Sequence, residues 1–486
     1  MSLFGLLLLP LVALGLVATG LPAFLVLIGV SVFGMLVGLL VFGLDVGILT
    51  ALPGRLVNLL ENDLLQALPL YVLMGALLDR LRIADALYRS GTALLRGQPA
   101  APLVSSIAIG AITGPMNGSV GASVLGLARV ISPRLLASGV PGGLRHALVV
   151  VASTLGVVIP PSLVLILLGD AMLNAHTIAL NATGRAERII NTQDVFRGAL
   201  LPAGLFLAGC LLVAWWSGRR LKPDVAAAPL TRAEIVTAVI TLLFLVTLLG
   251  GVATGAFYAV EAAALGATVL FFYGLLSGQL PGSVLGALLA DVLATAGALF
   301  ALLVAATTFT LLLRVLGADK LVTDWLVAMP GGDRAVAVVG LLAIGLSALV
   351  LDAFEIIFVV VPIVAPPLLM RVQDVTWVAV LVLLALQASF LLPPFGYALM
   401  MTRGALRDGT AFKETLRALA PFLALQIAVL LAVLAFPALV HLGEKADSRS
   451  LGNSQPLNQQ EIDQKFRQMI PLPGMGQDDM PPPPKF

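Results

Sequence analysis

Long apolar runs separated by short polar segments follow one another along nearly the whole chain. About 20 apolar residues are enough to cross a bilayer as a helix. The uninterrupted runs cover residues 3–19, 22–44, 64–80, 198–217, 233–250, 255–276 and 291–316, and a last one ends near 441. This pattern predicts an all-α polytopic membrane protein.

Two further segments have short apolar arms around a polar centre. The first, about 102–131, has small polar residues at 113–119, and the second, about 335–370, has the sequence LDAFE at 351–355. Each arm is too short to cross a bilayer. Non-helical backbone at membrane depth is tolerated only where it is buried in protein or lines a cavity. We therefore predict two re-entrant hairpins.

A pair of prolines interrupts each of two other apolar segments, at about 146–173 and about 375–404. The pairs lie in the sequences STLGVVIPPSLVLILLGD and LALQASFLLPPFGYALMM. Proline inside a helix removes a backbone donor and costs roughly 3 kcal/mol. A break also exposes helix ends, whose partial charges bind ions in transporters. A purely structural kink is the alternative interpretation.

Hairpin and interrupted helix recur in the same order in both halves of the chain. The first hairpin centre, near Asn117, precedes Pro160 by 43 residues, and the second, near Ala353, precedes Pro393 by 40. Such repeats of broken segments indicate a transporter site near the bilayer midplane. The predicted organisation is a first inverted repeat at 1–216, a cytoplasmic linker at 217–232, a second inverted repeat at 233–442 and a polar, disordered tail at 443–486.

Composition narrows the class of protein further. The chain is 59% hydrophobic and 11% charged, with a mean hydropathy of +1.04, whereas soluble domains carry about 25% charged residues. A net charge of +2 gives no reason to expect nucleic acid as a partner, and one cysteine excludes an internal disulfide. The three histidines show no spacing for a transition metal, and GPMNGSVG lacks the lysine ending of a nucleotide-binding loop. We expect neither ATP hydrolysis nor any other enzyme activity.

The distribution of basic residues predicts the orientation. With the N-terminus outside and each hairpin returning to its own side, fifteen Lys and Arg residues lie on the cytoplasmic side and eight outside. Cytoplasmic loops carry the excess of positive charge. The two halves are therefore expected to be inverted, with both termini on the periplasmic side.

Several segments together resemble a known family. The two Pro-Pro segments, GPMNGSVGASVLGLARVI at 114–131 and LDAFEIIFVVVPIVAPPLLM at 351–370 are similar to the large membrane subunit of tripartite ATP-independent periplasmic (TRAP) transporters. The likeness is to the mannitol or chloroaromatic subgroup and covers essentially 1–442. Many members have Thr before the second Pro-Pro pair, where this chain has Leu392, and the bulky Pro115 and Met116 replace small residues at the first tip.

The resemblance implies an elevator-type transporter of the bacterial inner membrane that imports small organic acids. It implies sodium as the coupling ion and no other cofactor. It also implies two protein partners, a small four-helix membrane subunit and a periplasmic substrate-binding protein. A stand-alone sodium- or proton-coupled organic-anion carrier of similar fold is the alternative. A membrane enzyme would need paired histidines or a nucleophile and base, and none is visible in the sequence.

The family resemblance also implies two sodium sites, each between a hairpin tip and the adjacent interrupted helix. The residues implied for the first site are Asn117, Gly118, Ser119, Thr154, Gly156, Pro160 and Ser162. Those implied for the second are Asp352, Glu355, Gln387, Ser389, Pro393 and Gly396.

Asp352 and Glu355 stand out by their chemistry alone. Ionisable groups at membrane depth are costly and usually mark ion or proton paths. Three residues apart, both lie on one face of a helix. Pairing with a buried arginine or capping of a helix end is the alternative. For Asn117 and Ser119 the alternative is close helix packing through small residues.

Overall fold

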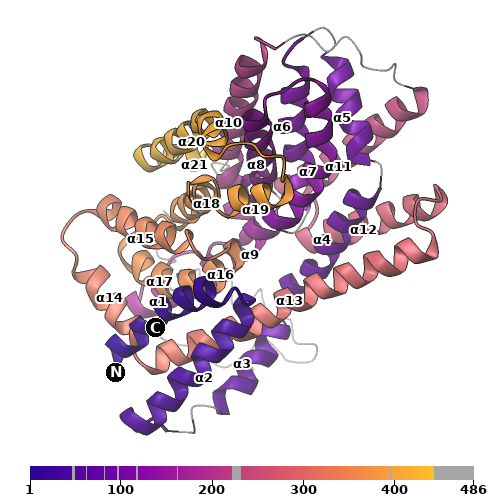
Figure 1. Ribbon diagram of the computed structural model, residues 1–486. Coiled ribbons are helices and arrows are strands. Elements are labelled where there is room, and N and C mark those ends of the chain that lie inside the picture. Colours follow the sequence, from indigo (N-terminus) through magenta and orange to yellow (C-terminus); the bar gives the residue numbers. More distant parts are fainter. Residues whose placement is uncertain are drawn as a thin grey trace, which may run out of the picture. The chain divides into compact units, whose positions relative to one another are not determined.

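The computed structural model describes residues 1–45, 47, 50–61, 63–81, 83–95, 98–116, 119–160, 162–221, 231–394 and 396–442. The tail at 443–486 and most of the linker, 222–230, lie outside the described residues. Within them every regular element is helical, and ten helices are long and apolar enough to cross a membrane (Figure 1). The predicted all-α polytopic membrane fold is confirmed.

The first half contains a hairpin and an interrupted helix, as predicted. It begins with α1 (Ser2–Thr19), α2 (Ala23–Phe42), α3 (Ala51–Leu60), α4 (Asp63–Arg80) and α5 (Ile83–Leu94). The first hairpin consists of α6 (Ala101–Thr113), the 3₁₀ turn η2 (Gly114–Met116) and α7 (Val120–Ala137). The first interrupted helix consists of α8 (Gly142–Val158) and α9 (Leu163–Thr183), and α10 (Thr192–Gly218) follows.

The second half repeats this order. It begins with α11 (Arg232–Thr254), α12 (Ala259–Leu276), α13 (Gly282–Val315) and α14 (Ala318–Ala328). The second hairpin consists of α15 (Asp333–Ser347), α16 (Ala353–Glu355), the π-helical η3 (Ile356–Val360) and α17 (Val361–Arg371). The second interrupted helix consists of α18 (Val375–Leu391) and α19 (Tyr397–Ala405), and α20 (Phe412–Ala435) and α21 (Ala438–His441) end the described chain. The boundaries of the two repeats and their inversion stay predictions.

The leading segments of the two interrupted helices form the centre of the structure. Every residue of α18 is buried, and so is every residue of α8 from Arg145 onward. α8 packs against α6, α7, α18 and α20. Apart from Arg145 and His146 at the start of α8, the sequences of both α8 and α18 are mostly apolar around the helix, which is typical of helices surrounded by other helices.

The two halves are intertwined through the same pair of elements. The second arm of the first hairpin, α7, packs against α19, and the second hairpin's α17 packs against α9. Each hairpin therefore contacts the interrupted helix of the opposite half as well as elements of its own.

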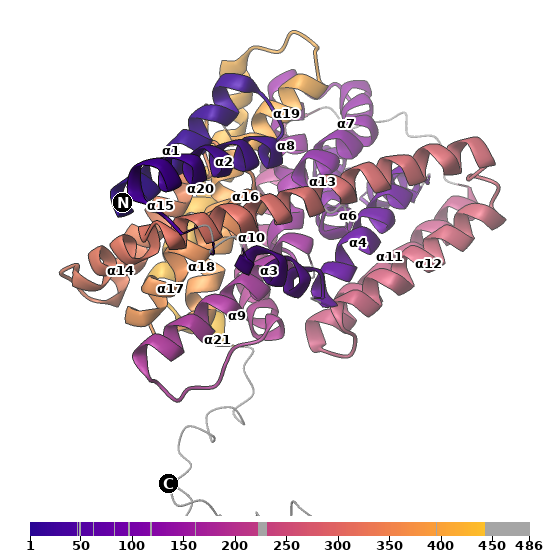
Figure 2. The same cartoon turned by 90° about the horizontal axis from the view of Figure 1, so that it is seen from below.

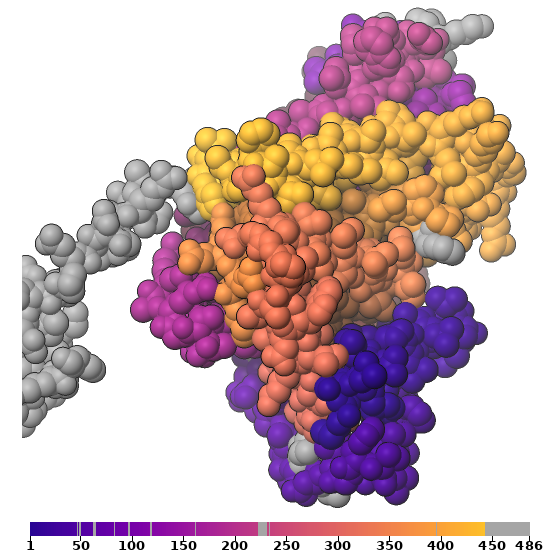
Figure 3. Space-filling model, turned by 90° about the vertical axis from the view of Figure 1, so that its left-hand side faces the viewer, coloured from indigo at the N-terminus to yellow at the C-terminus, as the bar shows by residue number. Residues whose placement is uncertain are grey.

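The long helix α13 and the N-terminal helices lie at the periphery. α13 has 34 residues and packs against α2 and α4, and Figure 2 shows its course past these helices. α1 packs against α14, and in Figure 3 the orange surface of the second half borders the indigo surface of the N-terminal helices.

Candidate functional site

Small residues hold the first hairpin against α8. A Cβ atom added to Gly110 would lie 2.4 Å from the carbonyl oxygen of Ala152, and one added to Gly156 would lie 2.3 Å from the carbonyl of Gly114. Gly110 of α6 and Gly114, the first residue of η2, are four residues apart and lie on one side of the hairpin, and Ala152 and Gly156, also four apart, lie on one face of α8. Small residues at this spacing let membrane helices approach closely. The tip of the first hairpin is therefore fixed against the end of α8.

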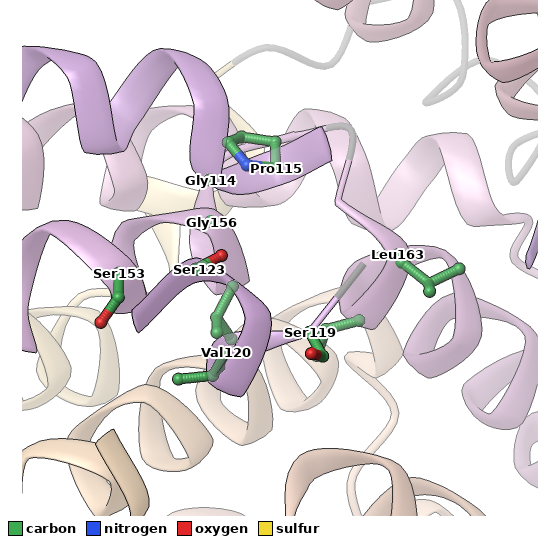
Figure 4. Close-up of a pocket in the computed structure, with 10 residues that line it drawn as sticks. Gly114, Pro115, Ser119, Val120, Ser123, Ser153, Gly156 and Leu163 are labelled. Atoms are coloured by element: carbon green, nitrogen blue, oxygen red, sulfur yellow. The ribbon is translucent and has the colours of Figure 1, made fainter. Parts of the chain in front are cut away.

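A small cavity lies directly at this contact. Its volume is about 10 Å³, roughly the room that one bound water molecule needs. Figure 4 shows the lining residues, which come from the tip and second arm of the first hairpin and from both parts of the first interrupted helix. They are Gly114, Pro115, Ser119, Val120, Ser123, Ser153, Gly156, Val157, Leu163 and Val164.

Three serine hydroxyls line this first cavity, and they differ in their hydrogen bonds. Ser119 caps α7 by accepting from the amide of Ala122 at 3.1 Å, and Ser153 donates to the Val150 carbonyl at 2.9 Å. No hydrogen bond joins the Ser123 hydroxyl to any residue in the described ranges. Ser123 is thus the hydroxyl most available to a guest. The predicted residues Asn117 and Gly118 lie outside the described residues.

Thr154, Pro160 and Ser162 do not line the first cavity, although the resemblance implied them. The Thr154 hydroxyl donates to the Val151 carbonyl at 3.0 Å and accepts from the Gln387 amide at 3.5 Å. Ser162 caps α9, since its hydroxyl accepts from the amide of Leu165 at 3.1 Å. Both hydroxyls therefore hold helices in place, and Pro160 is buried at the break.

The second hairpin tip carries the two acidic residues. The backbone amide of Asp352 donates to the Glu355 carboxylate at 3.0 Å, so Glu355 caps the start of α16. Atom Oδ1 of Asp352 is buried and has no hydrogen-bond partner among the described residues. No lysine or arginine within the described part of the chain forms an ion pair with either carboxylate. The two residues thus differ in role, because Glu355 completes a helix end and Asp352 retains an unused oxygen.

The predicted residues of the second break are buried to different degrees. Gln387 is fully buried and its Oε1 has no partner among the residues that the structure describes. The Ser389 hydroxyl donates to the Ala385 carbonyl at 2.7 Å. A Cβ atom on Gly396 would lie 2.6 Å from the Phe390 carbonyl oxygen, so only glycine fits there. Pro393 is half-buried.

Tyr397, the first residue of α19, connects these parts. Its hydroxyl lies 2.8 Å from the position that a Cβ atom on Gly121 of α7 would take. It also interacts electrostatically with Asp352 and Glu355. Tyr397 therefore brings the first hairpin, the second tip and the second break together.

The arrangement offers oxygen ligands of two kinds. Serine residues line the first cavity, together with the last turn of α8, a helix end that favours cations, and the first turns of α7 and α9. The second tip adds carboxylates, which hard cations also prefer. Within the described residues no group of three or more His, Cys, Asp or Glu side chains could hold a metal ion.

Comparison with known proteins gives concordant matches. Residues 11–439 match the model of a family described as "Tripartite ATP-independent periplasmic transporter, DctM component". The C4-dicarboxylate TRAP transporter large permease protein DctM of Rhodobacter capsulatus is 25% identical over 217 residues, covering 44% of this chain and 49%, about half, of that protein.

Two further matches cover more of the chain. The 2,3-diketo-L-gulonate TRAP transporter large permease protein YiaN of Escherichia coli is 21% identical over 389 residues, which is 79% of this chain and 87% of that protein. The crystal structure of the Alcanivorax borkumensis YdaH transporter, described as having an unusual topology, superposes with a TM-score of 0.59 at 15% identity. It covers 81% of this chain and 90% of the other. At this identity the likeness concerns the fold alone.

Proposed function

Because the chain belongs to the family of DctM components of tripartite ATP-independent periplasmic transporters, we propose that it imports a small organic acid, driven by a sodium gradient. Membership confirms the expected large permease subunit and also the expectation that the chain is not an enzyme. The substrate class is supported by the names of two relatives, which specify a C4-dicarboxylate and 2,3-diketo-L-gulonate. Both of these compounds are organic acids.

The observation that carries sodium coupling is the cavity at the first hairpin tip. It has the volume of about one water molecule and is lined by three serine residues but by no charged side chain. Hard cations prefer oxygen ligands, and the last turn of α8, which contributes Gly156 and Val157 to the wall, carries partial negative charge. A desolvated monovalent cation fits a space of this size and chemistry, which supports the proposal.

The second sodium site would lie at the second tip. Asp352 Oδ1 and Gln387 Oε1 are buried oxygens without hydrogen-bond partners among the described residues. An unsatisfied buried acceptor costs about 1–3 kcal/mol, and a bound cation would remove that cost. Leu392 supplies no hydroxyl here, so carboxylate and backbone oxygens would carry this site.

The proposed transport cycle is of the elevator type. The hairpins and interrupted helices form a mobile unit, and α1, α2, α11 and α12 form part of a scaffold. The glycine contacts between α6 and α8 support this division because they fix the first hairpin to the central helix. The proposed transporter has two further protein components, a periplasmic binding protein and a small four-helix membrane subunit. The chain would lie in the bacterial inner membrane with both termini on the periplasmic side.

The test is sodium-dependent uptake by the reconstituted complex with the Asp352→Asn variant. Sodium coordination uses the charged carboxylate, so we expect the sodium concentration for half-maximal uptake to rise about tenfold, the effect of losing one charge-assisted contact. Asp333→Asn, an exposed acid at the start of α15, is the matched control. Wild-type uptake that ignores sodium and follows a pH gradient would overturn sodium coupling. Uptake that persists without a binding protein would favour the stand-alone carrier.

A further inference from the structure

A larger cavity with several charged side chains in its wall lies between α4, α7 and α13. Its volume is about 290 Å³, and its polar wall consists of Asp79 and Arg80 of α4, Arg129 of α7, and Asp291 and Thr295 of α13. Ligand sites begin at about this size, so the space suits a molecule with few heavy atoms. The four charged side chains of its wall, Asp79, Arg80, Arg129 and Asp291, are all exposed, so a charged molecule could reach them.

The four charges of the cavity are not equivalent. Arg80 pairs with Asp291 at 3.0 Å, which joins α4 to α13. Asp79 lies against the backbone of α7, since a Cβ atom on Gly126 would be 2.5 Å from its Oδ1. Arg129, one turn beyond Gly126, interacts electrostatically with Asp79. No ion pair or hydrogen bond links Arg129 to any residue that the structure describes.

We propose that this cavity binds a carboxylate of the transported acid, with Arg129 as its ligand and Asp79 as an internal competitor; the inference rests on the proposed function. The planar guanidinium matches a carboxylate with two parallel hydrogen bonds. In this proposal Asp79, which lines the same cavity, competes for Arg129 when the substrate is absent. When the substrate enters, its carboxylate takes the place of Asp79 at closer range.

The position on α7 links this site to ion binding. Ser119 and Ser123 of α7 line the ion cavity, while Ala122 and Arg129 of the same helix line the larger one. One hairpin arm therefore carries hydroxyls for the cation near its tip and a guanidinium for the anion further along. A movement of this arm would carry both ligands together.

The experiment measures anion binding directly, without transport. The native Cys210 is buried, whereas Thr295 is an exposed residue of the cavity wall. In the full-length chain with Thr295→Cys, the rate of modification by N-ethylmaleimide reports whether the cavity is occupied. Acetate, succinate and citrate are the probes, with succinamide as the uncharged control for succinate.

We expect at least one carboxylate to slow modification about tenfold at ten times its dissociation constant, because only about one cavity in ten is then empty. Succinamide should give no protection. Arg129→Gln should weaken protection at least tenfold, Arg129→Lys should retain part of it, and Asp79→Asn should strengthen it. Size-exclusion profiles like that of the parent would show that these variants fold.

Absence of protection by all three carboxylates, equal protection by succinamide, or unchanged protection in Arg129→Gln would each overturn the site. Uptake of an organic acid by wild-type protein in vesicles is a separate measurement. If uptake occurs and protection does not, the site is wrong and the proposed function stands. If protection occurs and no organic acid is taken up, the proposed function fails while the anion site remains.

Discussion

The two hairpin-and-break units share one backbone plan but differ in charge and burial. In the first, the break is closed, with Pro160 and Ser162 buried, and its cavity contains only neutral oxygens. In the second, Pro393 is half-buried and Pro394 is exposed, and the tip carries two carboxylates. Repeated architecture therefore does not imply repeated chemistry.

The difference separates two ways to hold a cation. Neutral hydroxyls and carbonyls bind without any change of their own charge, so the affinity of such a site varies little with pH. Carboxylates bind more strongly but also exchange protons. The first unit is thus suited to a cation site whose affinity varies little with pH, and the second to a site whose affinity changes with pH.

The largest expected effect comes from the glycine contact that closes the first unit. Gly156→Ala would place a Cβ atom 2.3 Å from the Gly114 backbone, where no flexible side chain can yield. We expect a loss of about 1–3 kcal/mol of stability, typical of overpacking, together with loss of uptake. Thermal unfolding of the purified protein checks this. Gly204→Ala, whose Cβ would meet nothing within 4 Å, is the control. If Gly156→Ala and Gly204→Ala unfold at the same temperature, the close contact between Gly156 and Gly114 is contradicted.

A smaller effect is expected from the Ser123 hydroxyl of the neutral cavity. Ser123→Ala removes one uncharged ligand, so the sodium concentration for half-maximal uptake should rise roughly three- to tenfold, equally at pH 6 and pH 8. Ser106→Ala is the control in the other arm of the hairpin, where the hydroxyl donates to the Pro102 carbonyl at 2.7 Å. If Ser123→Ala needs the same sodium concentration for half-maximal uptake as the wild type, the first cavity is not a sodium site and the contrast between the two units fails.

The smallest effect concerns Asp408, which joins the second unit to the first. This residue of the loop after α19 forms an ion pair with Arg145 and a contact of 3.1 Å with His146, both of α8. Burial favours the neutral acid, but hydrogen bonds from Thr410, Arg145 and His146 outweigh it, and the pKa of Asp408 lies well below the usual aspartate range.

An aspartate whose pKa is lower in the folded than in the unfolded state stabilises the folded protein when the pH is above the unfolded pKa of about 4. This stabilisation is lost as the pH falls through the pKa of the folded state. Asp408→Asn should therefore lower the melting temperature modestly at neutral pH. The difference should shrink below about pH 4. A difference that keeps its full size in strong acid would show that Asp408 is not the charged partner.

The elements that were predictable from sequence are those with local signals. Proline pairs and short apolar arms indicated the interrupted helices and hairpins. The sequence DAFE also fits an Asp-x-x-Glu capping box, and the Glu355 cap follows that pattern. The helix α13 begins at Gly282, well before the expected 291, and Pro281 directly before it was a usable signal for that start.

Site residues were less predictable because they depend on helix rotation and distant contacts. Consecutive helix residues point about 100° apart, and this alone decides that Ser153 lines the cavity while its neighbour Thr154 faces Gln387. Ser123 is spaced one turn from Ser119, a usable signal. Nothing near Tyr397 in the sequence indicates its contact with Gly121, since the two halves meet only in the folded chain.

The length of α13 has a consequence for the surrounding membrane. A helix of 34 residues is about 51 Å long, whereas the hydrocarbon layer is about 30 Å thick. To keep its whole length within that layer, the helix would need to lean beyond the range of about 0–40° seen for membrane helices. Its ends must therefore reach into the headgroup regions. The thickness of the lipid bilayer thus helps to set the tilt of α13, against which α2 and α4 pack.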